Sequence, residues 1–177
     1  METTSLHRPS LPGTTLLDNR KSAIMNPDTP IREIMTTNLI TVGPDRTVEA
    51  IQELFRENEF HHIPVVDRGE RLIGIISKED VFKLSYVLSL QTTGKKYSEK
   101  EYQSLKAADI MTRYPVTLDP DDTVGLAADI FLANKFHALP IIEDDQLMGL
   151  VTTHDLLSYR FGEPTPPKQE EVFEEEL

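Results

Sequence analysis

The chain contains no cysteine among its 177 residues. This absence excludes disulfides, thiol catalysis, and metal or iron–sulfur sites with thiolate ligands. No apolar run is long enough to cross a bilayer, and the N-terminal residues lack a basic segment followed by an apolar stretch. The sequence therefore predicts a cytoplasmic protein that is neither secreted nor inserted in a membrane.

Positive charge is also scarce. The chain has 18 Lys and Arg against 30 Asp and Glu, and its formal net charge is −12. Residues 163–177 hold six Glu and one Lys, and residues 1–30 balance to zero, so the stretch between them carries −7. Nucleic acids and anionic membranes are bound through clustered Lys and Arg. We expect neither as a partner, and any phosphate ligand must be held by local donors.

The chain divides into a repeated centre and two polar ends. Residues 1–29 mix small polar residues with proline, and residues 162–177 are acidic, so both are predicted to be disordered. Between them, residues 30–88 and 108–161 form two similar domains. Residues 89–107 are a linker, in which Ser98 and Glu101 form a capping-box pattern that predicts a short helix up to about Lys106.

The two domains carry the same motifs in the same order. Ile-Met-Thr occupies 34–36 and 110–112, Asp-x-Thr-Val occupies 45–48 and 121–124, and Phe-His-x-x-Pro occupies 60–64 and 136–140. Each repeat closes with a seven-residue motif, at 74–80 and 149–155. It consists of Gly, two aliphatic residues, a hydroxyl residue, two other residues and Asp. Each repeat is about 50 residues long, too short to bury a core comfortably alone. We therefore expect the two halves to share one hydrophobic interior.

Each repeat predicts the order strand, helix, strand, strand, helix, which gives an α+β fold class. In the first repeat a short strand over 39–42 ends at Gly-Pro, and Thr47 caps a helix with apolar residues on one face. A hairpin over 63–66 and 72–76 follows, with a turn at 67–70, and a second helix starts at Ser77. The second repeat matches it with strands over 116–118, 139–142 and 147–151 and a last helix from Thr152.

The closing motif of each repeat pairs a hydroxyl with a carboxylate three residues later: Ser77 with Asp80, and Thr152 with Asp155. One interpretation is a helix N-cap, in which the hydroxyl accepts an N–H and the Asp favours the helix dipole. The other is a ligand site, because a helix N-terminus offers N–H groups to phosphate and an Asp can accept two hydrogen bonds from a ribose diol. Its occurrence twice, at matching positions, favours the ligand site.

His61 and His137 also match, each three residues before a strand proline, Pro64 or Pro140. Either the backbone satisfies each histidine at a corner, or its ring donates to phosphate oxygens. The two prolines would place a rigid apolar wall at the start of a strand.

Two further histidines have no counterpart in the other repeat. His62 stands opposite Ala138, and we interpret it as incidental. His154 lies inside the second hydroxyl-to-Asp motif, where it can face a ligand.

Neither a metal centre nor a catalytic group is predicted. The adjacent His61 and His62 would point opposite ways on a strand, and no His-x-x-His spacing occurs. Ser77 and Thr152 do not lie in a Gly-x-Ser-x-Gly elbow, and no Gly-rich phosphate loop is present. We expect no metal, no obligatory cofactor and no enzymatic activity.

Together these motifs resemble the CBS domain family, named after cystathionine beta-synthase, in its tandem pair or Bateman module. The marks are Asp-Ile-Met-Thr at 109–112, Phe-His-x-Leu-Pro-Ile-Ile at 136–142 and Gly-Leu-Val-Thr-x-x-Asp at 149–155, with altered forms in the first repeat. The resemblance covers about residues 30–161. It implies a stand-alone pair of β-α-β-β-α repeats packed about a pseudo-two-fold axis, with clefts for adenosine nucleotides between them.

The resemblance also implies roles for individual residues. Asp80 and Asp155 match ribose-binding aspartates, Ser77 and Thr152 match phosphate or ribose hydroxyls, and the matched histidines contact phosphate. With the wall prolines and His154, the predicted nucleotide-binding residues are Thr36, Ile40, Thr41, His61, Pro64, Ser77, Asp80, Thr112, Val116, Thr117, His137, Pro140, Thr152, His154 and Asp155.

One position departs from the family pattern. Members that sense nucleotides often place Arg directly after the histidine, where this chain has His62 and Ala138. The chain therefore lacks a planar, permanently charged donor for di- or triphosphates. Lys78, Lys135 and Arg113 are partial substitutes.

The resemblance implies a regulatory module that binds AMP, ADP or ATP and transmits this to a partner protein that the sequence does not name. The alternative is a dimerisation or scaffold module whose clefts are unused or hold another ligand, such as S-adenosylmethionine. In either case the resemblance implies a homodimer. If only one cleft is occupied, we expect the one with Thr152 and Asp155, because Glu79 adds negative charge near the other.

Overall fold

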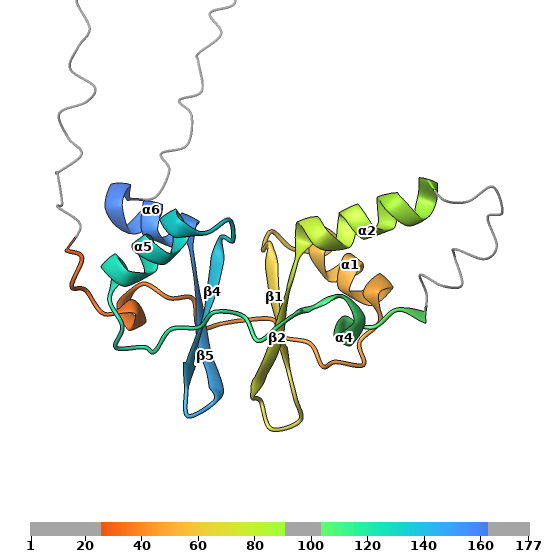
Figure 1. Cartoon of the computed structure of the whole chain (residues 1–177), viewed down its shortest axis with the longest axis horizontal. Helices are drawn as coiled ribbons and strands as arrows, with labels where there is room; N and C mark the ends of the chain where they lie inside the picture. Colours follow the sequence, from red (N-terminus) through yellow and green to blue (C-terminus); the bar gives the residue numbers. More distant parts are fainter. Residues whose placement is uncertain (1–25, 91–103, 163–177) are drawn as a thin grey trace, which may run out of the picture.

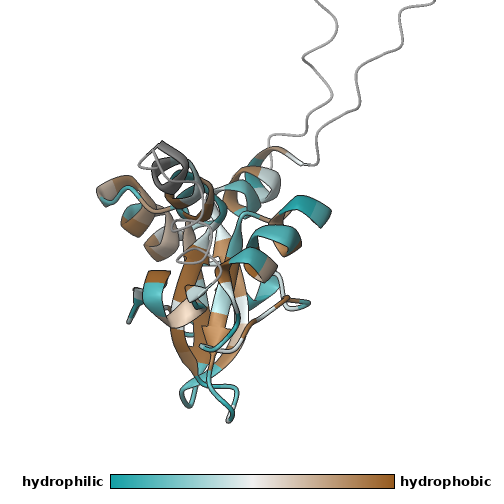
Figure 2. Cartoon of the chain, turned by 90° about the vertical axis from the view of Figure 1, so that its right-hand side faces the viewer, coloured by the Kyte–Doolittle hydropathy of each residue, from teal (hydrophilic) through white to brown (hydrophobic). Residues whose placement is uncertain are grey.

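Two similar halves lie side by side in the computed structural model, which describes residues 26–90 and 104–162 (Figure 1). Two hairpins stand in the middle and the helices lie outside them, and the strands are the most apolar part of the molecule (Figure 2). The first half contains α1 (Val48–Glu57), β1 (His62–Val66), β2 (Leu72–Ser77) and α2 (Lys78–Leu90), and the second contains α5 (Val124–Ala133), β4 (Ala138–Glu143), β5 (Gln146–Thr152) and α6 (Thr153–Phe161).

Both first helices begin as predicted. The Thr47 hydroxyl accepts a hydrogen bond from the backbone N–H of Ala50 at 3.3 Å, and the Thr123 hydroxyl accepts one from Leu126 at 3.2 Å. These caps satisfy N–H groups that have no partner within the helix. The apolar positions spaced three and four apart are buried: Val48, Ile51 and Phe55 in α1, and Val124, Ala127 and Phe131 in α5.

The predicted order of elements is confirmed, but the first strand of each repeat is reduced to a single bridge. Val42 pairs in parallel with Val65, and Leu118 pairs in parallel with Ile141. Pairing stops after Val42 because Gly43 and Pro44 follow it, and proline has no N–H to continue a ladder.

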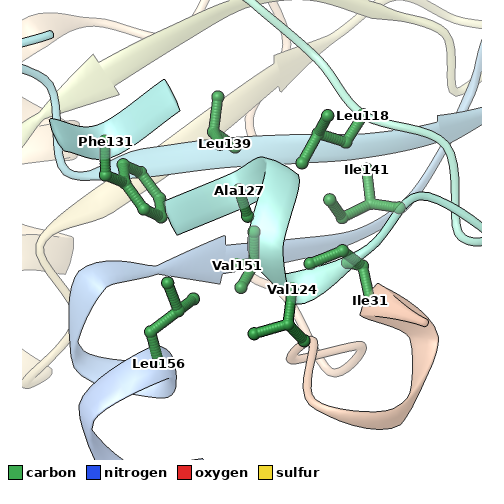
Figure 3. Packing of buried hydrophobic residues seen from close by; sticks show 9 residues of the cluster. All are labelled: Ile31, Leu118, Val124, Ala127, Phe131, Leu139, Ile141, Val151 and Leu156. Carbon is green, nitrogen blue, oxygen red and sulfur yellow. The ribbon is translucent and has the colours of Figure 1, made fainter. Parts of the chain in front are cut away.

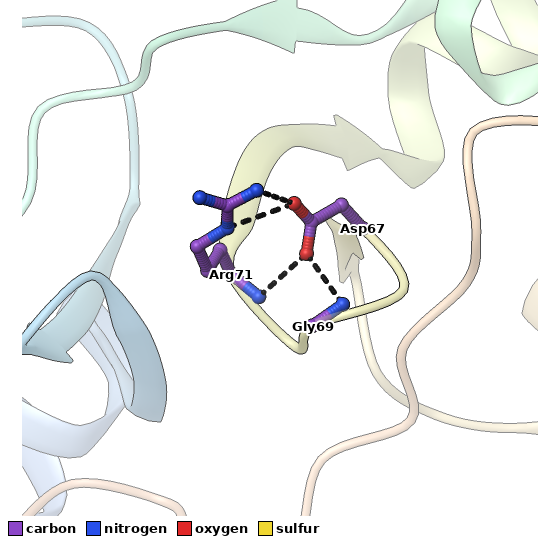
Figure 4. Close-up of polar contacts among 3 residues, drawn as sticks. All are labelled: Asp67, Gly69 and Arg71. Carbon is purple, nitrogen blue, oxygen red and sulfur yellow. Dashed lines mark hydrogen bonds and ion pairs between the residues drawn. The ribbon is translucent and has the colours of Figure 1, made fainter.

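The first hairpin turns where the sequence predicts, through a network around Asp67 (Figure 4). Its Oδ1 accepts the N–H of Gly69 at 2.8 Å and of Arg71 at 3.1 Å, and its Oδ2 accepts from the Arg71 guanidinium at 2.7 and 2.9 Å. The hydrogen bonds from Arg71 lower the pKa of Asp67. The second hairpin uses two residues of positive φ, Asp144 and Asp145, typical of a tight hairpin loop.

The expectation of one shared interior is wrong, because the buried side chains form two separate clusters. One joins α1, β1, β2 and α2, and the other joins α5, β4, β5 and α6 (Figure 3). Each cluster is completed by a segment from elsewhere in the chain. Ile31, in the short helix η1 (Ile31–Glu33) before the first repeat, lies in the second cluster, whereas Ala107, at the start of α4 (Ala107–Ile110), lies in the first.

Backbone hydrogen bonds fix this exchange of segments. The N–H of Val48 donates to the carbonyl of Leu105, and the N–H of Val124 donates to Thr29, both at 2.9 Å. Strand β3 (Thr112–Arg113) pairs with β2 of the first half, and Thr36 pairs with Leu150 in β5 of the second. Each repeat therefore folds around the segment that precedes the other one, which solves the burial problem of a short repeat.

The Gly of each repeat lies against the Met of the other repeat, where the exchanged segment crosses the strand. A Cβ added at Gly149 would lie 2.7 Å from Sδ of Met35 and 3.0 Å from the carbonyl oxygen of Thr36. Gly74 has the same relation to Met111, with a distance of 2.5 Å to its Sδ. Only a glycine allows the crossing segment to lie this close to the strand.

We expect Gly149→Ala to lower the free energy of unfolding by about 1 to 3 kcal/mol, because the added methyl overpacks the contact with Met35. Urea denaturation measures this. Gly43→Ala is the matched control, because within the described residues no atom beyond its chain neighbours lies within 4 Å of a Cβ at Gly43. Equal stability of the two variants would contradict the close crossing.

Some predictions fall on residues that the structure does not describe. The predicted disorder of residues 1–29 and 162–177 lies almost wholly outside the described part, as does most of the helix predicted from Ser98. The first described residue of this predicted helix, Ser104, is helical, but Lys106 instead bridges to Thr47 and α4 starts one residue later. Of the helices within 26–90 and 104–162, none has the length and apolar character of a membrane span.

Candidate functional site

A cleft of about 1330 Å³ is lined by residues of both halves. This volume exceeds that of a typical closed ligand pocket, so the cleft is an open groove. It brings together eight of the predicted nucleotide-binding residues, from five separate parts of the chain. They are Thr36, Ile40, His61, Ser77, His137, Thr152, His154 and Asp155.

The other seven predicted residues do not line this cleft: Thr41, Pro64, Asp80, Thr112, Val116, Thr117 and Pro140. Pro64 and Pro140 lie inside β1 and β4, where their carbonyl oxygens accept the N–H of Val42 and of Leu118, each at 3.1 Å. Thr112 pairs with Ile75 in β2, the position equivalent to Thr36 beside Leu150. Their binding role stays a prediction for a second cleft related by the pseudo-symmetry.

Thr152 and Asp155 form a complete capping box at the start of α6. Asp155 Oδ2 accepts from the backbone N–H and from the hydroxyl of Thr152, both at 2.7 Å, and the Thr152 hydroxyl accepts from the N–H of Asp155 at 3.2 Å. Among the described residues, the other carboxylate oxygen, Oδ1, has no hydrogen-bond partner. The cap therefore fixes the carboxylate and leaves one oxygen for a ligand in the cleft.

The equivalent pair, Ser77 and Asp80, makes fewer contacts. The Ser77 hydroxyl donates to Asp80 Oδ2 at 2.6 Å and accepts from the N–H of Asp80 at 3.1 Å. Ser77 lines the cleft, but Asp80 does not. The two motifs look alike in sequence, yet only the one at Asp155 presents its carboxylate to this cleft.

Thr36 reaches the cleft through the exchanged segment. Its N–H donates to the carbonyl of Leu150 and its carbonyl accepts from the N–H of Leu150, both at 2.9 Å. Leu150 lies two residues before Thr152 on β5. Because residues two apart on a strand share a face, this pairing puts Thr36 beside the hydroxyl of Thr152.

The matched histidines have a backbone role at the corner and also line the cleft, and donation by their rings to phosphate stays a prediction. Their carbonyl oxygens accept the first N–H of a helix, His61 from Lys78 at 2.8 Å and His137 from Thr153 at 3.1 Å. The same two residues line the cleft from opposite halves. His154 lines it as well, and its Nδ1 lies 3.2 Å from the Ser158 hydroxyl.

His62 is not incidental, because it also lines the cleft. Burial lowers the pKa of His62 to about 4, and the nearby His61 and His137 add to this effect. The ring is therefore neutral at physiological pH. Comparison of the repeats did not identify His62 as a site residue, because its counterpart is Ala138. Its position directly after a matched histidine could have indicated that it lies at the site.

The expectation that Glu79 lies near the other cleft is also wrong. Glu79 lines the same cleft as Thr152 and Asp155. Its carboxylate forms an ion pair with Lys83 at 2.8 Å, and this contact lowers the pKa of Glu79, so the group is ionised at neutral pH. The first turns of α2 and α6 therefore line the same cleft, rather than one cleft each. Pairwise comparison of the repeats does not reveal this arrangement.

A further group of lining residues comes from the C-terminal end of α1 and the loop after it: Arg56, Glu57, Asn58, Glu59 and Phe60. The sequence interpretation did not include them as site residues. The charges of Arg56, Glu57 and Glu59 have no match in the second repeat, although Phe60 and Asn58 do. The corresponding loop after α5 contributes only His137. The cleft is therefore asymmetric, although the fold is pseudo-symmetric.

Across the described ranges, no group of three or more His, Asp or Glu residues is placed to hold a metal ion. Beside its charged side chains, the cleft offers hydroxyls, imidazoles, the Oδ1 of Asp155 and the N-termini of α2 and α6. These groups can bind a polar ligand that carries both a diol and an anion.

Sequence comparison supplies relatives for both halves. An inosine-5'-monophosphate dehydrogenase of Korarchaeum cryptofilum is 33% identical over 135 residues, which is 76% of this chain but only 25% of the dehydrogenase. The chain thus spans about a quarter of that enzyme.

Two crystal structures share the fold. The CBS domain of a CBS domain-containing membrane protein from Sphaerobacter thermophilus is 30% identical, with a TM-score of 0.61 over 77% of this chain and 91% of that one. CBSX2, a CBS-pair protein of Arabidopsis thaliana, in complex with AMP is 28% identical, with a TM-score of 0.61 over 72% of this chain and 93% of that one.

The family model of the CBS domain matches residues 31–86 and 107–162, one match for each half. The paired Gly and Met residues and the two hydroxyl-to-Asp motifs all lie within these matches. The chain therefore belongs to the CBS domain family, as a tandem pair of CBS domains.

Proposed function

We propose that this CBS pair is a regulatory module that binds an adenosine nucleotide, AMP, ADP or ATP, in the cleft between its halves and transmits the occupancy to a partner protein. The observation that carries the proposal is the fixed carboxylate of Asp155, which keeps one oxygen without a described partner in a cleft lined by both repeats. The likeness to the AMP complex of CBSX2 supports the choice of ligand.

The chemistry of the cleft fits the parts of a nucleotide. Asp155 Oδ1 is suited to accept hydrogen bonds from the ribose hydroxyls, and the hydroxyls of Thr36 and Thr152 lie on the same side. The N-termini of α2 and α6 favour an anion such as phosphate. The side chains of Leu39 and Ile40 supply apolar surface for a base.

The proposed regulation follows from the position of the cleft. A ligand shifts an equilibrium only through different affinities for two states. The cleft is lined by residues of both halves, so any change in their relative position changes its contacts with a ligand. Binding would favour one relative position, and a partner that contacts both halves would detect it.

A role in dimerisation is the second candidate. Large apolar side chains are exposed one turn apart on two helices: Phe82 and Tyr86 on α2, the latter 65% exposed, and Leu157 and Phe161 on α6, the latter 56% exposed. Exposed apolar stripes of this kind are typical of protein interfaces. A homodimer through these helices is compatible with nucleotide binding and also with an unused cleft.

Calorimetry on the full chain separates the two candidates. We expect AMP, ADP or ATP to bind, with S-adenosylmethionine as the alternative adenosine ligand. Absence of binding by all four would exclude the sensor and leave the scaffold. Light scattering on the same samples gives the oligomeric state, and a monomer at micromolar concentration would exclude the homodimer.

A further inference from the structure

The charged residues that line the cleft are unusual for a site that would hold several phosphates. Six side chains carry formal charge there: the cations Arg56 and Lys78, and the carboxylates of Glu57, Glu59, Glu79 and Asp155. Anions therefore outnumber cations by four to two. Each further phosphate on a ligand adds repulsion in such a site, since like charges disfavour one another at short range.

The few cations in the cleft are poorly placed to offset this excess. Arg56 lies 3.6 Å from Glu53 in an ion pair on α1, and Glu79 lies 2.8 Å from Lys83 on α2, so part of each charge is already offset and the excess rests mainly on Glu57, Glu59 and Asp155. Lys78 has no ion-pair partner among the described residues, and it is the one cation left for a ligand. His62, which occupies the position directly after the matched histidine, remains neutral because burial lowers its pKa.

One place in the cleft is nevertheless suited to an anion. The N–H groups of Lys78, Asp80, Thr153 and Asp155 are used by His61, Ser77, His137 and Thr152. Within the described residues, no acceptor pairs with the N–H of Glu79 or of His154, the second residues of α2 and α6. These two donors come from facing repeats and lie at the positive ends of two helices. Both residues line the cleft, so each N–H is available to a phosphate that lies there.

The end of α1 gives the opposite environment. Glu57 is the last residue of this helix, Asn58 is its C-cap and Glu59 follows, and all three line the cleft. The C-terminus of a helix carries partial negative charge, which adds to the two carboxylates. A chain of phosphates that extended along the cleft would meet this acidic segment.

We propose that the cleft selects an adenosine ligand with one phosphate and discriminates against di- and triphosphates through Glu57, Glu59 and Glu79. This inference rests on the proposed nucleotide-binding function, and it specifies the class of ligand. The phosphate lies between the N-termini of α2 and α6. The acidic residues act by repulsion, so they set specificity rather than affinity for the monophosphate.

The test is calorimetry of AMP, ADP and ATP, without magnesium, on the full chain and on the double variant Glu57→Gln/Glu59→Gln. We expect the wild type to bind AMP at least about tenfold more tightly than ATP, and the double variant to reduce this ratio by about fivefold or more, mainly by strengthening ATP binding. The ratio should also decrease with added salt, because salt screens repulsion in an open cleft. Glu49→Gln is the matched control, since Glu49 lies at the other end of α1 and does not line the cleft.

The outcomes separate this inference from the function on which it rests. Binding of AMP and ATP with equal affinity, or an unchanged ratio in the double variant, would overturn the selection and leave nucleotide binding intact. Tighter binding of S-adenosylmethionine than of AMP would overturn the phosphate position. If no adenosine ligand binds, the proposed function fails and the selection fails with it.

Discussion

Replacement of Ile31 by Ala is expected to lower the free energy of unfolding by about 3 to 4 kcal/mol, as for other large-to-small changes at fully buried sites. Ile31 is 0% exposed, although it lies near the start of the described chain, before the first repeat. Its side chain packs among Leu118, Val124 and Ile141 of the second half (Figure 3). Removal of three carbons there leaves a cavity in a cluster that the surrounding backbone cannot easily close.

The location of the destabilised region in Ile31→Ala is as informative as the loss of stability. Relative to the wild type, the variant should show a larger increase in amide exchange in β4 and β5 than in β1 and β2. The reason is that Ile31 belongs to the second cluster only. Leu132→Ala is the control, because Leu132 is 86% exposed and its truncation should change stability by less than about 0.5 kcal/mol. Loss of protection in β1 and β2 instead would contradict the exchange of segments.

Asp155→Asn is expected to weaken AMP binding by about 30- to 100-fold. The amide oxygen of Asn can still accept from Thr152 and keep the cap of α6, but the second carboxylate oxygen becomes an NH2 group that cannot accept from a ribose hydroxyl. Loss of hydrogen bonds to a charged acceptor accounts for an effect of this size. Calorimetry measures the affinity, and the thermal midpoint checks that the fold is retained.

Two controls isolate the contribution of the ribose contact. Asp80→Asn should change binding in this cleft by less than about threefold, since Asp80 does not line it and pairs with Ser77 instead. Adenosine should lose as much affinity as AMP in Asp155→Asn, because it has no phosphate whose repulsion by the carboxylate would be relieved. Equal effects of the two Asp variants would show that ligand binds at the second, pseudo-symmetric cleft as well.

Local sequence patterns were sufficient to predict the helices and strands and to identify the family. Thr47 and Thr123 have side chains that cap helices wherever the following residues are helical, and the apolar spacing behind them selects the buried face. The turn at Asp67 depends on hydrogen bonds within five residues. Motifs that occur twice, in the same order, also identify the tandem CBS pair, because each motif is a contiguous stretch of chain.

The sequence predicted only part of the residues that line the cleft. The hydroxyls, Asp155 and the matched histidines are found by comparison of the repeats, since both copies keep the same chemistry. His62 and the charged residues Arg56, Glu57 and Glu59 were missed, because they differ between the copies. A comparison of repeats detects what the pseudo-symmetry preserves, and it cannot detect residues that make the two sides different.

The sequence by itself determined the two repeats, their helices and hairpins, the acidic charge and the chemistry of the closing motifs, because all of these depend on neighbouring residues. The tertiary structure alone decided which segment completes which core and which residues face the same cleft. Ile31 packs on the second repeat, and Glu79 lies with Asp155. Such contacts join residues far apart in the chain, and they depend on how the buried surface of each short repeat is covered, which no local pattern specifies.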